Sequence, residues 1–354
     1  MISSLALVVL AAAGWATGDP ARLAKGREVY LQGCVLCHGQ DGRGNPEWES
    51  AVRPVEFSDC GTTAEPTEQW ETIVKKGGPA RGLASVMPAF GDAYGDEEIA
   101  AVVAYIRTFC ATADAYPPGD LNFRRLLETG KAFPEAEVVL RSSHRPQSGR
   151  RETDLEVQYE NRLGPRFQYE LVLPLRAQAS PGEGRGLGDV EVEAKQVLRF
   201  DAARRQILSG GLGVTLPTGS ESKGLGSGTV FLAPFVAHGK GWDRTFLQTK
   251  VGLEVPLDAG KADKELTYAV GLSRSVGPPR TAWTPALELT GNWNTRTHRL
   301  EYALWVETSK PLNRLGHVLG AVGAQVPIRP RGETWRIEAY LLWDFGDGPF
   351  WLGW

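Results

Sequence analysis

The sequence has few of the residues that usually hold metals or build hydrolytic sites. Among 354 residues there are four Cys, five His and two Met. No Ser/His/Asp set and no carboxylate pair stands out, so hydrolytic and acid–base catalysis have no support. Basic residues form no block, and the net charge of −3 argues against a nucleic-acid partner. The chain also lacks a hydrophobic run of about 20 residues, the length of a membrane-spanning helix.

The longest apolar run, from Ile2 to Ala13, lies at the start of the chain. Small residues follow it, with cleavage expected near Ala16 or Gly18, so residues 1–18 are predicted to be a signal peptide. No Lys or Arg precedes Arg22, and an uncleaved membrane anchor is the alternative. The chain is therefore predicted to be exported from the cytoplasm.

Two of the four cysteines belong to a C-x-x-C-H motif, formed by Cys34, Cys37 and His38. This spacing is typical of covalent haem c, whose vinyl groups take up two thiols while the histidine ligates the iron. A thioredoxin-like motif would follow a strand, whereas the preceding residues predict a helix. A zinc site would need a second pair of ligands nearby. Cys60 and Cys110 are too far apart in the sequence to supply that pair.

Cys60 and Cys110 remain once the motif has taken its two thiols. In an exported chain a disulfide between them is the economical interpretation, and two buried free thiols are the alternative. The bond would tie the loop after the haem motif to the end of the last helix of this region.

The iron of a c-type haem usually needs a second axial ligand. Met87 is the candidate, because the other methionine, Met1, lies in the predicted signal peptide. A thioether opposite His38 would raise the reduction potential relative to two histidines. The other interpretation makes Met87 a core residue and leaves the sixth position open for a gas or peroxide. None of the other four histidines falls in this part of the chain.

Helical periodicity and helix-end signals predict three helices around the motif, at residues 22–31, 66–76 and 96–109. With these helices and the segments around Cys34, Pro54 and Met87, residues 20–113 resemble a class I, single-haem cytochrome c. The resemblance implies that a proline carbonyl accepts a hydrogen bond from the axial histidine. Pro54 is the candidate, with Pro46 as the other choice. It also implies that the first and last helices cross near Gly26, Tyr30 and Tyr105.

The second part of the chain changes from helical to alternating periodicity. Residues 114–134 are predicted to be a linker with a polar connector, and residues 135–354 a β domain. About 12 alternating runs of roughly 10 residues each follow, the length of a tilted transmembrane strand. Eight of the eleven Trp lie after residue 240, and the chain ends on an aromatic segment, which favours an outer-membrane barrel. A soluble antiparallel β domain is the alternative.

The fold class expected is therefore an all-α cytochrome c domain followed by an all-β antiparallel barrel of about 12 strands. The function expected is one-electron transfer by a single covalent haem c, with the haem domain in the periplasm of a Gram-negative-type bacterium. The expected partners are redox proteins and outer-membrane lipid, and the chain is expected to be an electron carrier rather than an enzyme. The alternatives are a pore with a redox-coupled cytochrome, and an electron-donating subunit of an oxidase or reductase with a soluble β domain.

Overall fold

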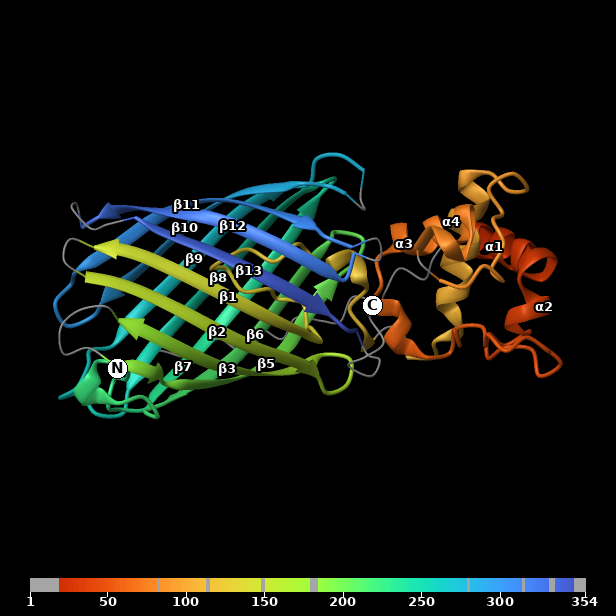
Figure 1. Cartoon of the computed structure of the whole chain (residues 1–354). Coiled ribbons are helices and arrows are strands. Elements are labelled where there is room, and N and C mark those ends of the chain that lie inside the picture. The colour runs from red at the N-terminus through yellow and green to blue at the C-terminus, as the bar shows by residue number, and fades with distance from the viewer. Residues whose placement is uncertain are drawn as a thin grey trace, which may run out of the picture.

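The computed structural model consists of a small helical unit at one end of a long β-barrel (Figure 1). It describes residues 19–81, 83–112, 115–147, 150–178, 184–278, 281–313, 316–330 and 335–346. The predicted signal peptide and the aromatic C-terminal segment lie outside these residues. Among the described residues, no helix combines the length and the apolar character needed to cross a membrane.

The helical unit contains the three predicted helices and a short one that carries the haem motif. Asp19 caps the first helix by accepting a hydrogen bond from the Ala21 N–H, and Gly77 ends α3 (Thr67–Lys76) with a positive φ of 77°. The helices are α1 Pro20–Gly33, α2 Val35–His38, α3 Thr67–Lys76 and α4 Asp96–Ile106. Short 3₁₀ turns are η1 Cys60–Ala64, η2 Gly78–Arg81, η3 Arg107–Phe109, η5 Gly119–Leu121 and η6 Glu221–Lys223.

The core of this unit forms where α1 crosses α4. A Cβ atom placed on Gly26 would lie 2.1 Å from the Ala101 carbonyl oxygen, so only glycine permits this approach. The Tyr30 ring is fully buried at the crossing, with its centroid 5.5 Å from that of Tyr105. The crossing near Gly26, Tyr30 and Tyr105 is therefore confirmed.

Twelve long antiparallel strands close into a barrel, which confirms the predicted fold class and strand number. The ring closes because β1 pairs with both β2 and β13, and β2 pairs onward with β3. The short β4 pairs with β3 beside the ring. The strands are β1 Glu137–Gln147, β2 Arg150–Arg162, β3 Phe167–Gln178, β4 Arg185–Leu187, β5 Val190–Asp201, β6 Gln206–Leu216, β7 Phe231–Trp242, β8 Thr245–Pro256, β9 Glu265–Arg274, β10 Thr284–Asn294, β11 Leu300–Pro311, β12 Val318–Arg329 and β13 Arg336–Asp344.

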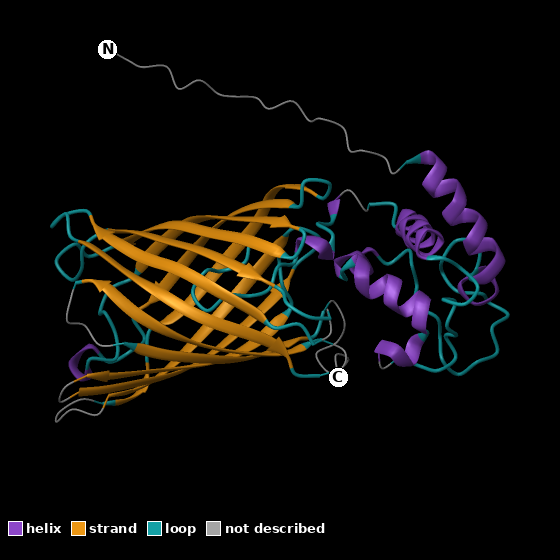
Figure 2. Cartoon of the chain, turned by 90° about the horizontal axis from the view of Figure 1, so that it is seen from above, coloured by secondary structure: helices purple, strands orange, loops and turns teal. Residues whose placement is uncertain are grey.

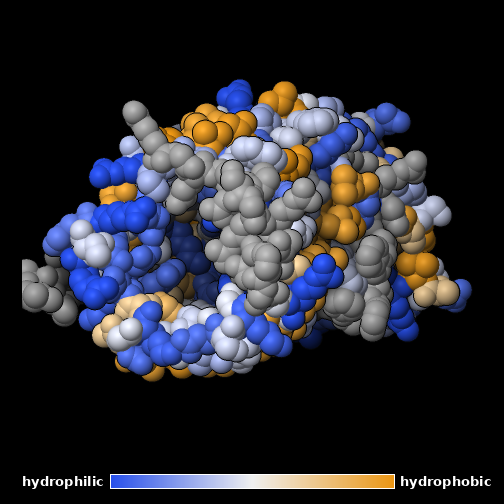
Figure 3. Space-filling model, turned by 60° about the vertical axis from the view of Figure 1, so that its left-hand side comes forward, coloured by the Kyte–Doolittle hydropathy of each residue, from blue (hydrophilic) through white to orange (hydrophobic). Residues whose placement is uncertain are grey.

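Side chains alternate between the two faces of the barrel wall with polar residues inside. On β10 the Glu288 carboxylate is completely buried, while its neighbours Leu287 and Leu289 are 51% and 38% exposed. Figure 3 shows hydrophobic patches on the outer wall and a hollow with hydrophilic residues at the barrel end remote from the helices. An apolar outer wall around a polar lumen is the arrangement of a transmembrane barrel.

Exposed tryptophans lie near both ends of the wall. Trp242 and Trp283 lie at the end facing the helical unit, and Trp293 and Trp335 lie at the other end. This placement fits interfacial girdles, as the sequence predicted. Trp305 is the exception, because its ring is fully buried and its Nε1 donates to Thr290 Oγ1 at 3.3 Å.

Residues 119–136 cover most of the predicted linker and the first two residues of the predicted β domain. They do not form a free connection between two separate units. They run into the barrel, where Figure 2 shows loop inside the ring of strands. Leu121 and Leu127 in this segment are completely buried. The prediction of a polar connector at 121–134 is wrong for a physical reason. The connector's charged and apolar residues meet partners on distant strands rather than solvent. We call residues 119–136 the lumen segment.

Candidate haem site

The haem motif occupies a single helical turn at the end of α1. The N–H groups of Cys37 and His38 both bond the Cys34 carbonyl, at 3.2 and 3.0 Å. Gly39 ends the turn with a positive φ of 73°. A helix rather than a strand precedes the motif, so the thioredoxin-like alternative lacks its structural context.

The two thiols of the motif are unpaired, one buried and one partly exposed. Burial, with a smaller effect of Cys37, raises the pKa of the Cys34 thiol to about 11. Burial also raises the pKa of Cys37. Reactive and metal-binding cysteines have depressed pKa values, because the thiolate is the nucleophile and the ligand. Neither thiol therefore has the lowered pKa of an activated cysteine, and thioether bonds to a haem would consume both S–H groups.

The His38 imidazole is held on two sides. Its Nδ1 atom lies 3.4 Å from the Val55 carbonyl oxygen, and its ring stacks on Phe57 with centroids 4.3 Å apart. Burial lowers the pKa of His38, against a smaller opposing effect of the Val55 carbonyl. An Nδ1–H···O bond fixes the tautomer and leaves Nε2 as the lone-pair nitrogen. A neutral, oriented imidazole is what iron ligation requires.

The carbonyl facing His38 belongs to Val55 and not to the predicted Pro54, which corrects the sequence assignment by one residue. Both residues lie in an irregular segment that leads to Phe57, and the Phe57 N–H donates to the Gly42 carbonyl at 2.7 Å. The choice between neighbouring carbonyls therefore depends on where the segment is anchored, which the sequence does not reveal.

Met87 lies on the loop between η2 and α4. Its carbonyl accepts a hydrogen bond from the Gly78 N–H at 3.0 Å, and its side chain is partly buried. The Cβ of Met87 would lie 3.2 Å from a Cβ on Gly78, so the loop packs closely against the end of α3. The loop is thus fixed, and iron ligation by Met87 stays a prediction.

A disulfide joins Cys60 to Cys110, with Cα atoms 5.1 Å apart, as the sequence analysis expected. It connects η1 to the residue after η3 across 50 positions of the chain. The segment carrying Val55 and Phe57 is thereby tied to the end of the last helix.

Several apolar side chains beside the haem motif are exposed. Leu36 within the motif is 71% exposed, and others flank the segments that carry Val55 and Met87. They are Val52, Val55, Leu83 and Val86. A flat, largely apolar ring system bound between these segments would find apolar partners, so the residues present fit a haem. Within the described part of the chain, no group of three His, Cys, Asp or Glu residues is placed to hold a metal ion.

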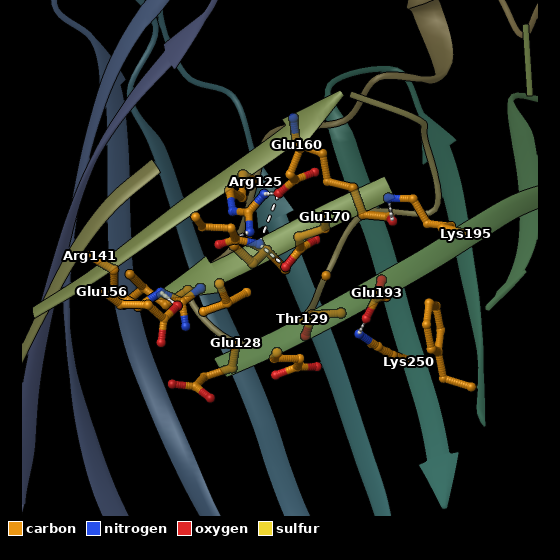
Figure 4. Close-up of a pocket in the computed structure, with 18 residues that line it drawn as sticks. Arg125, Glu128, Thr129, Arg141, Glu156, Glu160, Glu170, Glu193, Lys195 and Lys250 are labelled. Carbon is orange, nitrogen blue, oxygen red and sulfur yellow. Dashed lines mark hydrogen bonds and ion pairs between the residues drawn. The ribbon is translucent and has the colours of Figure 1, made fainter. Parts of the chain in front are cut away.

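Polar residues inside the barrel form a second cluster, which the sequence analysis did not identify. Arg125 donates through Nη1 to Glu137 and Glu160, at 2.7 and 2.6 Å, and through Nη2 to the Gln158 side chain at 2.8 Å. Figure 4 shows this arginine among carboxylates of the surrounding strands. The signal available in the sequence was the density of Arg, Lys and Glu in residues 124–137, which is unusual for a short connector.

Comparison with known proteins separates the two parts of the chain. Residues 21–106 match the family described as Cytochrome C oxidase, cbb3-type, subunit III. The Cbb3-type cytochrome c oxidase subunit FixP of Azorhizobium caulinodans is 34% identical over 107 residues, which are 30% of this chain and 34% of that protein. The chain therefore spans about a third of the length of the curated relative it matches.

Solved structures resemble the barrel. An outer membrane channel from Pseudomonas putida F1 is 15% identical, covers 63% of this chain and 100% of its own, and has a TM-score of 0.47. The KdgM porin in complex with disordered oligogalacturonate is 13% identical, covers 59% of this chain and 99% of its own, and has a TM-score of 0.43. The chain thus joins a cytochrome c domain at residues 21–106 to a closed, twelve-stranded antiparallel barrel.

Proposed function

We propose that this protein carries single electrons in the periplasm on one covalently bound haem c, held at the outer membrane by its barrel. The observation that carries the proposal is the helical turn with two unpaired thiols next to a buried, oriented imidazole. Haem c, when bound, supplies an iron that alternates between the ferrous and ferric states.

Each residue of the site has a separate task in this proposal. Cys34 and Cys37 would form the thioethers that prevent loss of the haem. His38 would ligate the iron, and the Val55 carbonyl would strengthen its donor character through Nδ1. Met87, on its fixed loop, would supply the second ligand. No step of electron transfer needs a proton from these groups, so a carrier rather than an enzyme is proposed.

The barrel supports placement of the haem domain in the periplasm. β1 begins and β13 ends beside the helical unit (Figure 1). The longest connection between neighbouring strands whose residues are all described, 217–230, lies at the opposite end. Outer-membrane barrels have short periplasmic turns and longer external loops. The helical unit thus lies at the end expected to face the periplasm, where redox proteins would be its donors and acceptors.

The proposal is tested by the mass and visible spectrum of the full-length protein produced with haem c maturation. The peptide that contains Cys34 and Cys37 is expected to carry the mass of one haem. Cys34→Ala with Cys37→Ala is expected to yield colourless protein, whereas Cys60→Ala with Cys110→Ala is a matched control that keeps the haem. Colourless wild-type protein would overturn the proposal.

Ligation by Met87 and the orientation of the barrel need their own measurements. Met87→Ala is expected to remove the methionine–iron charge-transfer band, and an unchanged spectrum would exclude Met87 as ligand. An epitope placed in the connection at 257–264 is expected to be stained on intact cells. Staining of an epitope in the helical unit on intact cells would instead place the haem domain outside the cell.

A further inference from the structure

Whether the barrel admits solutes depends on what fills its interior. The lumen segment passes through its interior, and the wall binds the segment's backbone from several strands. Glu307 on β11 accepts from the Leu127 N–H at 2.9 Å. Glu288 on β10 accepts from the Glu128 and Thr129 N–H groups at 3.1 and 2.7 Å.

Donors from the rest of the ring bind the carbonyls of the same segment. Lys195 on β5 donates to the Lys131 carbonyl at 2.9 Å. Gln248 on β8 and Tyr340 on β13 donate to the carbonyls of residues 124 and 125, each at 2.8 Å. Partners on five strands around the ring satisfy a backbone that has no secondary structure of its own after η5, so the segment has a defined position.

The wall is also shaped for the segment's apolar side chains. A Cβ on Gly271 of β9 would lie 2.2 Å from Leu126, and a Cβ on Gly323 of β12 would lie 2.5 Å from Leu127. A side chain at either point would force the facing leucine to shift. The fit leaves no solvent layer between these leucines and the wall.

Two cavities lie on either side of the segment's charged residues. One, of about 220 Å³, is lined by lumen-facing residues such as Glu170, Glu193 and Lys250 (Figure 4). The other, of about 240 Å³, lies towards the helical unit and is lined by Glu65, Asp120 and Arg205 among others. Arg125 and Lys131 line both cavities. These two side chains therefore form a partition one residue thick.

The partition is rigid because its charges are mutually paired. Lys131 Nζ lies 2.6 Å from a Glu135 oxygen and 3.5 Å from Glu137, and Glu137 also binds Arg125. Arg125 and Lys131 are only 7% and 8% exposed. Moving either side chain aside would leave buried carboxylates without a counter-charge, which is strongly unfavourable.

We infer that the lumen segment closes the barrel to ions and solutes, with Arg125 and Lys131 as the partition between an outer and an inner vestibule. The barrel then serves as an anchor for the haem domain rather than as a pore. The inference rests on the barrel spanning a membrane and is independent of the haem, so either can fail without the other.

The test is ion conductance of the full-length protein in planar lipid bilayers. Wild-type protein is expected to give no stepwise current, and Arg125→Ala is expected to give such steps. Arg141→Ala is the matched control. Arg141 lines only the cavity that lies away from the helical unit, and it pairs with Glu338 at 3.3 Å. This variant also loses one arginine side chain and its charge, but it is expected to give no stepwise current.

Folding of each variant is checked by heat-modifiable mobility on gels. A second variant, with residues 121–134 replaced by a Gly/Ser segment of equal length, is expected to conduct even if Arg125→Ala does not fold. Wild-type protein that conducts like an open pore would overturn the inference. A folded replacement variant that stays silent would also overturn it, and equal currents from Arg141→Ala would overturn the assignment of the partition.

Discussion

The helical unit and the barrel distribute their residues in opposite ways. In the helical unit Tyr30 and Val102 are completely buried, and the Lys25–Glu98 ion pair lies on the surface. In the barrel Glu288 is completely buried and Leu289 is exposed. The helical unit has the distribution of a protein surrounded by water, and the barrel has the one expected of a wall surrounded by lipid with polar groups within.

The difference also changes what fixes each unit. The helical unit relies on apolar packing at the Gly26 crossing and on a covalent link between Cys60 and Cys110. The barrel relies on a closed backbone ladder, and its lumen is organised by charge pairs such as Arg125–Glu137. The two units should therefore respond differently to the same kind of perturbation.

Removal of the disulfide should separate the two units most clearly. The bond closes a loop with a sequence separation of 50 residues. Chain entropy predicts that Cys60→Ala with Cys110→Ala lowers the unfolding free energy of the helical unit by about 4 kcal/mol. The measurement is urea unfolding followed by helical circular dichroism, with the barrel followed by gel mobility. A barrel that unfolds together with the helices would show that the units are one cooperative body.

A charge on the lipid side tests the inverted distribution of the barrel. Leu289 lies near the middle of β10, so Leu289→Arg is expected to lower barrel stability by about 2–4 kcal/mol. Leu289→Ala at the same site is the control and should cost less, because it adds no charge. Stability is measured by unfolding and refolding in lipid vesicles. Equal stability of the two variants would mean that this wall faces water.

These regions also differ in how far the sequence predicts them. Helix ends, the haem motif and the strand number follow from local patterns, since capping residues and alternation act within a few positions. The Cys60–Cys110 pair followed from counting thiols. The position of the lumen segment did not follow, because its partners are remote. Thr129 is 159 residues from Glu288, to which it donates.

The haem site shows the same limit at a smaller scale. The residue types proposed to hold the haem can be read from the sequence, because the thiol spacing and the single available methionine leave few choices. The carbonyl that orients His38 was misplaced at Pro54 instead of Val55, since it depends on the path of an irregular loop. Local chemistry is thus encoded in short motifs, while orientation depends on tertiary contacts.

The crossing of α1 and α4 should be sensitive to a single methyl group. Gly26→Ala places a Cβ 2.1 Å from the Ala101 carbonyl oxygen and should destabilise the helical unit by about 1–3 kcal/mol. Gly95→Ala is the matched control, because its Cβ would meet only a Glu98 oxygen at 3.9 Å. Both are measured by urea unfolding of the helical unit. If Gly95→Ala lowers the stability of the helical unit as much as Gly26→Ala does, the crossing is not the cause of the loss.

The smallest expected effect lies on α3, at the junction of the two units. Burial raises the pKa of Glu71 above its usual 4.5. The charge of Arg22 lowers this pKa, and the carboxylates of Asp120 and Glu68 raise it further. A carboxyl group with a raised pKa binds its proton more tightly in the folded chain. It therefore favours folding below about pH 4.5, and this contribution is lost as the pH rises through the raised value.

Glu71→Gln removes this titration, so the stability of the helical unit should fall less between pH 4.5 and neutrality than in the wild type. The measurement is urea unfolding at the two pH values, with Glu47→Gln on an exposed loop as the control. If the stability of Glu71→Gln changes with pH as much as that of the wild type, the junction relaxes and hydrates this carboxylate. Because Asp120 also caps α3 by accepting from the Thr67 N–H at 3.0 Å, such relaxation would reach the start of the lumen segment. The slope thus reports how tightly the helical unit is joined to the barrel.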